Sequence, residues 1–264
     1  MIKLDNIVKT FNKSGVNEIE LYNGLNLEVN TGDFITVIGS NGSGKSTLFN
    51  VICGNIPIDS GTVIFDEKDI TGEKEYILNR EFARIFQDPL AGVSPNMTIL
   101  ENLAIAANKG KRFNLQQAIE KNKIEEYKEI LSTLNLDLED KLHVPVKSLS
   151  GGQRQALTLI MATLKQPSLL LLDEHTAALD PKTSELIIQL TNKIVQEKNL
   201  TTLMITHNLK QALTCGNRLI MMHKGKIIMD LNEEEKKTLT TKQLIERFNE
   251  LNLIDDLSDE MVLV

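Results

Sequence analysis

The sequence predicts an α/β fold with an antiparallel β subdomain near its N-terminus and an inserted α-helical subdomain. Three observations support this fold class. Apolar strands of the buried type alternate with helices in the first and last parts of the chain. Residues 2–8 and 24–29 alternate apolar with polar positions, as half-buried strands do. The stretch from about residue 89 to residue 166 has helical spacing, with Glu and Lys on the outer face.

The first third of the chain reads mainly as strands. Residues 2–8 and 24–29 are predicted to be half-buried strands, and residues 61–65 another strand. Residues 33–39 form a nearly continuous apolar run, which is typical of a strand buried on both faces. A helix is predicted over residues 45–53, because Gly54 and Pro57 follow it as stop signals.

The rest of the chain reads as helices followed by a return to strands. Helical spacing covers residues 96–107 and 115–134, and a further helix is predicted over residues 182–197. Buried strands are predicted at residues 168–173 and 201–206.

The C-terminal part begins with a predicted hairpin over residues 218–231, which turns at residues 223–226. The charge run at residues 233–237 is interpreted as a solvated turn, and a last helix begins near Thr240, where Gln243 completes a capping box. We therefore predict an α/β core of residues 1–87 and 167–231, a helical subdomain of residues 88–166, and a C-terminal helix and tail of residues 232–264.

Composition limits the possible partners. The 264 residues carry a net charge of −7, which argues against nucleic acid, because phosphate binding needs clustered Lys and Arg. Cys53 and Cys215 lie in no metal or redox spacing, which favours a reduced, cytosolic chain. We expect no signal peptide, and the longest apolar stretches are shorter than the ~20 residues of a membrane span. Any membrane spans must come from another chain.

The strongest local motif is a glycine-rich loop between a buried strand and a helix. Its glycines let backbone N–H groups surround phosphates, and the helix that follows adds the positive end of its dipole. In this pattern Lys45 reaches the β- and γ-phosphates, and Ser46 offers its hydroxyl to Mg²⁺. The predicted nucleotide-binding residues are Gly39, Ser40, Asn41, Gly42, Ser43, Gly44, Lys45, Ser46 and Thr47.

Two further motifs carry chemistry. Asp173 and Glu174 end a buried strand, where a carboxylate is costly unless it holds a cation or a partner. Asp173 suits the Mg²⁺ shell, and Glu174 suits a general base that polarises the attacking water. A second phosphate-binding surface is predicted where a helix begins at Ser150, Gly151, Gly152 and Gln153. One nucleotide does not need two cradles, so a head-to-tail pair of chains is expected.

In their order along the chain, these motifs resemble those of the ATP-binding cassette ATPases, over essentially the first 230 residues. The matching motifs are the phosphate loop, Gln87, the signature at residues 149–153, the acidic pair, Asp180 and His207. The resemblance implies a RecA-like P-loop core and two chains that close over two ATP molecules. It assigns adenine stacking to Phe11, Mg²⁺ and water contacts to Gln87, communication between sites to Asp180, and a γ-phosphate contact to His207.

Two departures point to a subgroup. His175 stands where most relatives have Pro, and we interpret it as a packed side chain; Met161 stands where Arg is common. Together with residues 92–97 and 180–183, these choices resemble bacterial importer ATPases. Such subunits work at the cytoplasmic face of the membrane, with a permease and a substrate-binding lipoprotein. Amino acids, including aromatic ones, are the cargo that this likeness implies.

Other classes remain as alternatives. A soluble cassette ATPase of iron–sulfur cluster assembly is similar in size, but it differs after the acidic pair. A DNA-repair or chromosome ATPase would place long coiled coils between the phosphate loop and the signature, and no sustained heptads lie there. A translation factor would carry two cassettes, and a fused exporter its own membrane spans. We expect the permease to dock at residues 87–102. The tail from Phe248 onward matches no general motif of the cassette family.

Overall fold

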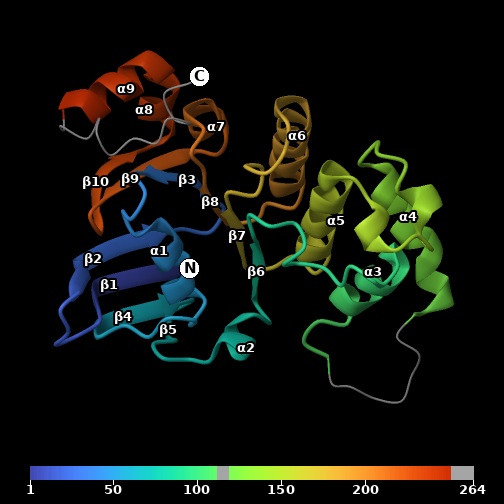
Figure 1. The fold of residues 1–264 in the computed structure, drawn as a ribbon, viewed down its shortest axis with the longest axis horizontal. Coiled ribbons are helices and arrows are strands. Elements are labelled where there is room, and N and C mark those ends of the chain that lie inside the picture. The colour runs from blue at the N-terminus through green and yellow to red at the C-terminus, as the bar shows by residue number, and fades with distance from the viewer. Residues whose placement is uncertain (112–118, 251–264) are drawn as a thin grey trace. The chain divides into compact units, whose positions relative to one another are not determined.

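The computed structural model describes residues 1–111 and 119–250. Contacts group the chain into two compact units. The first unit comprises Met1–Glu81 with Leu200–Val264, and the second comprises Phe82–Asn199. Each unit is described by itself, and Figure 1 labels their elements. The division into domains predicted from the sequence remains a prediction.

An antiparallel sheet forms the N-terminal part of the first unit, with the strand order β2-β1-β4-β5 (Figure 1). Ile2 of β1 pairs with Val29 on one side and with Phe65 on the other. Ile2 and Leu4 of β1 are buried and Lys3 and Asp5 are exposed, as the sequence alternation predicts. The alternation shifts by one position at Asn6, where the pairing with β2 is irregular. The antiparallel subdomain is therefore confirmed, with the strands β1 (Ile2–Phe11), β2 (Ile19–Val29), β4 (Ser60–Phe65) and β5 (Lys68–Asp69).

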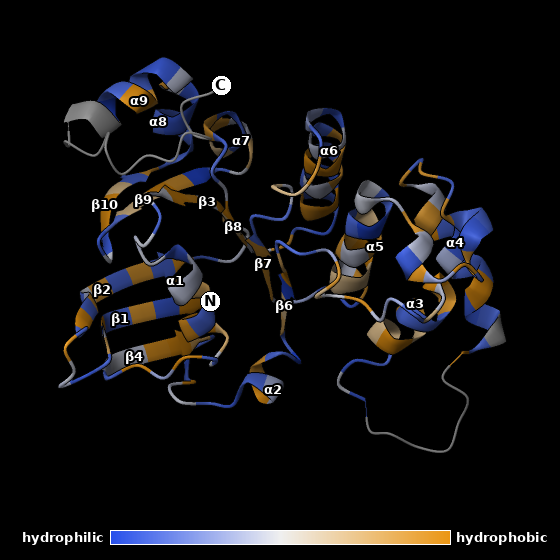
Figure 2. Cartoon of the chain, viewed as in Figure 1, coloured by the Kyte–Doolittle hydropathy of each residue, from blue (hydrophilic) through white to orange (hydrophobic). Residues whose placement is uncertain are grey.

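The second group of strands in this unit surrounds β3, all of whose residues are buried. β3 pairs in parallel with β8 and with β9, and β10 pairs with β9 as the predicted hairpin. Figure 2 shows the hydrophobic character of β3 and β8, which fits strands covered on both faces. The elements are β3 (Phe34–Gly39), α1 (Lys45–Ile52), α2 (Glu75–Leu78), β8 (Thr202–Ile205), α7 (Leu209–Thr214), β9 (Arg218–His223) and β10 (Lys226–Leu231).

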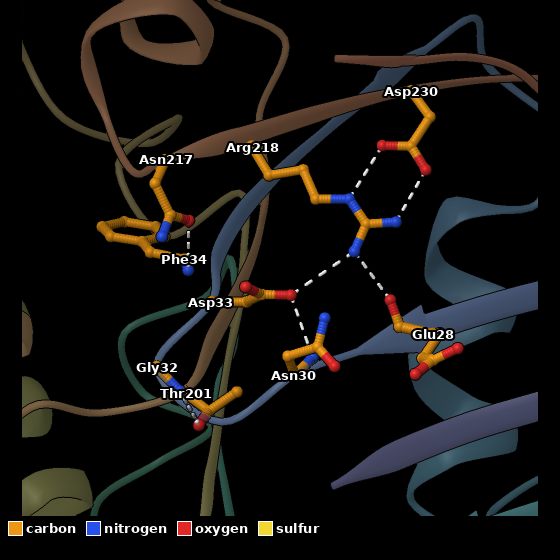
Figure 3. Close-up of polar contacts among 9 residues, drawn as sticks. All are labelled: Glu28, Asn30, Gly32, Asp33, Phe34, Thr201, Asn217, Arg218 and Asp230. Atoms are coloured by element: carbon orange, nitrogen blue, oxygen red, sulfur yellow. Dashed lines mark hydrogen bonds and ion pairs between the residues drawn. The ribbon is translucent and has the colours of Figure 1, made fainter. Parts of the chain in front are cut away.

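A polar network holds the start of β3 to its neighbours (Figure 3). The Arg218 guanidinium binds both carboxylate oxygens of Asp230, at 2.8 and 2.6 Å, and donates to the Glu28 carbonyl at 2.7 Å. It also lies 3.4 Å from Asp33, whose carboxylate accepts from the Asn30 backbone N–H. These bonds join β2, β9 and β10 at the amino end of β3. Bonding to Asp230 raises the pKa of Arg218, so the group stays charged.

The charge run at residues 233–237 is not a turn, so that interpretation is wrong. It forms the short helix α8 (Glu233–Thr238), because Asn232 and Glu235 complete a capping box. Lys236 is 3% exposed, and its ammonium donates to the carbonyl groups of Cys215 and Gly216. Burial lowers the pKa of Lys236 to about 8. A side chain with these acceptors needs no contact with solvent.

The C-terminal helix α9 (Thr241–Glu250) starts where the sequence predicts. Thr240 and Gln243 form reciprocal capping bonds. Leu244 is fully buried in a cluster with residues of β3, α7 and β9, so α9 covers the core of the first unit. Residues 251–264 lie outside the described residues.

The second unit contains the short parallel pair β6 (Phe82–Ile85) and β7 (Leu169–Asp173) and a set of helices. The strand β6 was not predicted, because four residues show no clear periodicity. The helices are α3 (Ile99–Ala107), α4 (Ile124–Ser132), α5 (Gly151–Thr163) and α6 (Pro181–Glu197), with 3₁₀ turns at Lys121–Lys123, Glu139–Lys141 and Val146–Ser148.

Two helices of this unit differ in extent from the sequence prediction. α3 begins at Ile99 rather than near residue 96, because Thr98 and Glu101 form its capping box. α4 begins at Ile124, after the 3₁₀ turn, and residues 112–118 of the predicted helix lie outside the described residues. Within the described part of the chain, no helix has both the length and the apolar composition that a bilayer span requires.

Candidate active site

The phosphate loop connects β3 to α1 in the first unit. Gly39 has φ +149°, and a Cβ there would lie 2.1 Å from the Met222 carbonyl oxygen, so only glycine fits. Gly44 occupies the N-cap of α1. No side chain caps this helix end, and its first turn contains no acidic residue. The N–H groups and dipole of this helix end therefore stay available to an anion.

Lys45 lies inside the loop rather than in solvent. Its side chain is 5% exposed, and its ammonium donates to the carbonyl oxygens of Gly39 at 2.7 Å and Ser40 at 2.9 Å. The loop thus holds a positive charge among its own backbone groups. Ser46, the next residue, is exposed at the start of α1. The loop therefore contains a buried lysine followed by an exposed serine.

Two contacts from other strands brace the loop. The Tyr22 hydroxyl of β2 donates to the Gly44 carbonyl at 2.6 Å, and the Gly225 N–H of the β9–β10 turn donates to the Ser43 carbonyl at 3.0 Å. Tyr22 is fully buried, and burial raises the pKa of its hydroxyl, which therefore remains a donor. Sequence reasoning missed Tyr22, because a tyrosine within a strand reads as an ordinary core residue.

His207 follows β8 at the same sheet edge as the phosphate loop. Val37 of β3 is level with Ile205 of β8, so the parallel register brings the two strand ends together. Thr206 fixes the turn, because its backbone N–H donates to the Val37 carbonyl and its hydroxyl donates to Gln211. His207 itself is half-buried. The fold of the first unit thus places this histidine near the phosphate loop. The order of residues in the sequence does not show this proximity.

The predicted adenine contact, Phe11, ends β1 and is half-buried. The Lys9 ammonium lies 5.3 Å from the centroid of its ring. One face of the aromatic ring is therefore near a cation, which attracts the π-electrons of the ring.

The second unit repeats the edge geometry with its own pair of strands. Ile85 of β6 is level with Leu172 of β7, so Gln87 and the Asp173–Glu174 pair leave the same edge. Leu169 to Leu172 are fully buried, whereas Asp173 and Glu174 are partly exposed. Figure 2 shows the hydrophobic character of β7. Gln87 is exposed. Glu174 has φ +48°, a backbone conformation that is uncommon for a residue with a side chain and is often found at active sites.

Asp173 is not isolated at this edge. Its Oδ2 accepts a hydrogen bond from Nη2 of Arg84, a residue of β6, at 2.5 Å. Sequence reasoning missed this partner, because the strand that carries Arg84 was not predicted. No signal in the sequence links these two residues, which are 89 positions apart.

His175 is 2% exposed, which confirms its interpretation as a packed side chain. Its Nε2 lies 3.1 Å from the Thr191 hydroxyl, which itself donates to the Ile187 carbonyl. Since that hydroxyl proton is used, Nε2 must carry the imidazole proton and donate to Thr191. Burial lowers the pKa of His175 to about 4, so the ring is neutral at physiological pH.

The signature begins α5. Ser150 caps the helix, accepting from the Gln153 N–H at 3.2 Å, and the Gln153 side chain returns a bond to the Ser150 N–H. Gly151 is exposed, but Gly152 is buried, where a Cβ would lie 2.3 Å from the Thr183 methyl of α6. The exposed surface of this helix start is therefore smaller than expected, because Gly152 serves the close packing of α5 on α6.

Asp180 caps the next helix, α6. Its carboxylate accepts from the Thr183 N–H at 3.1 Å, and Pro181 occupies the first helical position. Hydrogen bonds from Thr183 lower the pKa of Asp180, which therefore stays ionised. In this structure Asp180 orders the segment after the acidic pair.

A buried parallel strand that leads through a glycine-rich loop into a helix, with a carboxylate pair after another buried strand, defines a P-loop nucleoside triphosphatase. Residues 22–177 match the sequence profile described as ABC transporter. The chain belongs to the ABC transporter family and is an ATP-binding, ATP-hydrolysing protein. The family, the fold class and the ATPase activity predicted from the sequence are confirmed.

Relatives in sequence include transport and import ATP-binding proteins. The chain is 47% identical over 248 residues to a tyrosine transport ATP-binding protein of Clostridioides difficile (strain R20291), covering 94% of this chain and 98% of that protein. It is 32% identical over 261 residues to a spermidine/putrescine import ATP-binding protein of Haemophilus influenzae, covering 97% of this chain and 64% of that protein.

Solved structures agree in fold. An ATP-binding cassette of an ABC transporter in its ADP conformation has a TM-score of 0.75 at 31% identity, covering 94% of this chain and 98% of that chain. A dimeric cassette in a post-hydrolysis state, bound to ADP and Pi, has a TM-score of 0.72 at 29% identity, covering 88% of this chain and 99% of that chain.

Proposed function

We propose that this chain is the ATPase subunit of an importer that takes up an amino acid, with tyrosine as the first candidate. The main support for this proposal is the 47% identity to a tyrosine transport ATP-binding protein, which extends over 94% of this chain and 98% of the relative. None of the relatives given above serves iron–sulfur cluster assembly, so that alternative is not proposed.

In the proposed site, the chain's own residues divide the work on ATP. The phosphate loop and Lys45 hold the β- and γ-phosphates, and Phe11 stacks on adenine. Glu174 accepts a hydrogen bond from the attacking water, and Gln87 and His207 orient the water and the γ-phosphate. Ser150, Gly151 and Gln153 face the nucleotide of a second copy in a head-to-tail dimer, and Asp180 communicates between the two sites.

The residues fit Mg²⁺, which supplies charge neutralisation between the phosphates when it is bound. Ser46 is exposed at the helix start, and Asp173 Oδ1 accepts no hydrogen bond within the described part of the chain. The described residues contain no group of three or more His, Cys, Asp or Glu that would hold a metal without further ligands.

We further propose that a permease docks beside Gln87 and holds the chain at the cytoplasmic face of the membrane. Apolar side chains are exposed there, with Leu90 at 40% and Met97 at 42%. Isolated exposed apolar residues are common, but these two both lie within residues 87–102, the segment predicted to contact the permease. An extracytoplasmic substrate-binding lipoprotein completes the proposed importer.

The test is co-purification from gently solubilised membranes of the native cell. We expect a polytopic permease and a binding lipoprotein, and the lipoprotein should bind tyrosine and not spermidine. Leu90→Glu with Met97→Glu should abolish recovery of the permease, whereas Ile19→Glu, which adds charge at a 57% exposed site in the first unit, should retain it. Recovery with soluble partners only would refute the transport function.

A further inference from the structure

The ion pair between Arg84 and Asp173 joins the two parallel strands of the second unit. Arg84 Nη2 lies 2.5 Å from Asp173 Oδ2, and the two side chains are only 11% and 14% exposed. Arg84 is level with Leu171 in the strand register, so its side chain extends along β6 to reach the carboxyl edge. A short, charge-assisted bond in partial burial is among the stronger polar contacts and is weakly screened by salt.

This pairing occupies a carboxylate that the proposed function assigns to Mg²⁺. Asp173 carries one negative charge, so a guanidinium and a divalent cation beside it repel each other. The arginine therefore lowers the affinity of this edge for a divalent cation as long as it remains in place. A purely structural partner, such as a backbone N–H, would not have this effect.

The guanidinium also lies against an aromatic ring while it holds Asp173. The Arg84 guanidinium carbon lies 4.9 Å from the centroid of the Phe86 ring, within the range of a cation–π interaction. Phe86 is 36% exposed and directly precedes Gln87. Arg84 thus touches both the carboxylate at the end of β7 and the segment that leads to the expected partner-sensing loop.

We propose that Arg84 is a positioning residue that competes with a divalent cation for Asp173 and couples cation binding to the Phe86–Gln87 segment. Without the cation, Arg84 holds Asp173. When the cation binds, the guanidinium gives up Asp173 and keeps the Phe86 ring as its remaining partner. Movement of that segment by a partner changes, in turn, how readily Asp173 accepts the cation. This inference rests on the assignment of Asp173 to the cation.

The test measures the Mg²⁺ dependence of nucleotide binding, not activity, on the full chain with a fluorescent, non-hydrolysable ATP analogue. We expect Arg84→Gln to lower the Mg²⁺ concentration for half-saturation by about tenfold, as loss of one nearby positive charge implies. Binding of the analogue in EDTA should not change. Arg84→Lys should lie between the two proteins. Arg80→Gln, which removes an exposed arginine four positions earlier, should match the wild type.

A second variant keeps the test decisive if Arg84→Gln does not fold. Phe86→Ala removes the partner that the guanidinium would keep after leaving Asp173. Arg84 should then release Asp173 less readily, so the Mg²⁺ requirement should rise. An unchanged requirement in Phe86→Ala, or an unchanged or higher one in folded Arg84→Gln, overturns the competition. Asp173→Asn tests the cation assignment separately from the competition by Arg84. If this variant keeps the wild-type Mg²⁺ dependence, the assignment of Asp173 to the cation is wrong. If it loses that dependence while Arg84→Gln changes nothing, only the competition is wrong.

Discussion

The buried His175 makes a quantitative prediction about stability against pH. The pKa of this histidine falls from 6.5 to about 4 in the folded chain because of burial. The unfolded chain therefore binds more protons between these two values, so the contribution of His175 is fully present above pH 6.5 and is lost as the pH falls. Each pKa unit corresponds to 1.36 kcal/mol, so the loss between pH 7 and pH 4.5 is about 2 kcal/mol.

The assay compares urea unfolding of the wild type and of His175→Gln at pH 7, 5.5 and 4.5. Other groups titrate in both proteins, so the difference in unfolding free energy isolates His175. We expect that difference to shift by about 2 kcal/mol in favour of the variant as the pH falls. Thr191→Val removes the hydrogen-bond acceptor but leaves the burial, so it should keep the pH dependence. If the difference in unfolding free energy does not change with pH, the conclusion that the buried His175 imidazole is neutral in the folded chain is wrong.

The remaining predictions concern the phosphate loop and the acidic pair. Tyr22→Phe removes one hydrogen bond to Gly44, so we expect a loss of about 1 kcal/mol in unfolding free energy and weaker ATP binding, measured by calorimetry; Tyr76→Phe at an exposed site serves as the control, and unchanged ATP affinity would contradict the bracing role. Lys45→Ala should weaken ATP binding, because the loop loses its buried cation. Glu174→Gln should bind ATP and accumulate as a closed dimer in light scattering; hydrolysis at the normal rate would contradict the general-base role.

Several features of the site could be predicted from the sequence because they depend on neighbouring residues. The phosphate loop is a contiguous run between an apolar strand and a helix, so its function follows from local backbone geometry and helix electrostatics. The acidic pair is recognisable because a carboxylate after four buried leucines needs a partner. The capping box of Thr240 and Gln243 predicts the start of α9. A second capping box, formed by Ser150 and Gln153, lies within the signature.

The charge run at residues 233–237 shows where such local reasoning fails. Its composition is that of a solvated turn, yet Asn232 starts a helix and Lys236 finds carbonyl acceptors on residues 215 and 216. Burial of a lysine depends on partners that lie about 20 positions away, and composition carries no information about them. The strand β6 was missed for a similar reason, since its pairing with β7 defines it.

The sequence by itself therefore determined the family and the ATPase chemistry and predicted the residues that contact phosphate, since the motifs are runs of consecutive residues with a fixed local geometry. Only the tertiary structure decided which strand ends share an edge, placing His207 beside the phosphate loop and Gln87 beside Asp173. It also revealed Tyr22 on Gly44 and Arg84 on Asp173. Contacts between distant positions arise from packing and strand register, which no local pattern encodes.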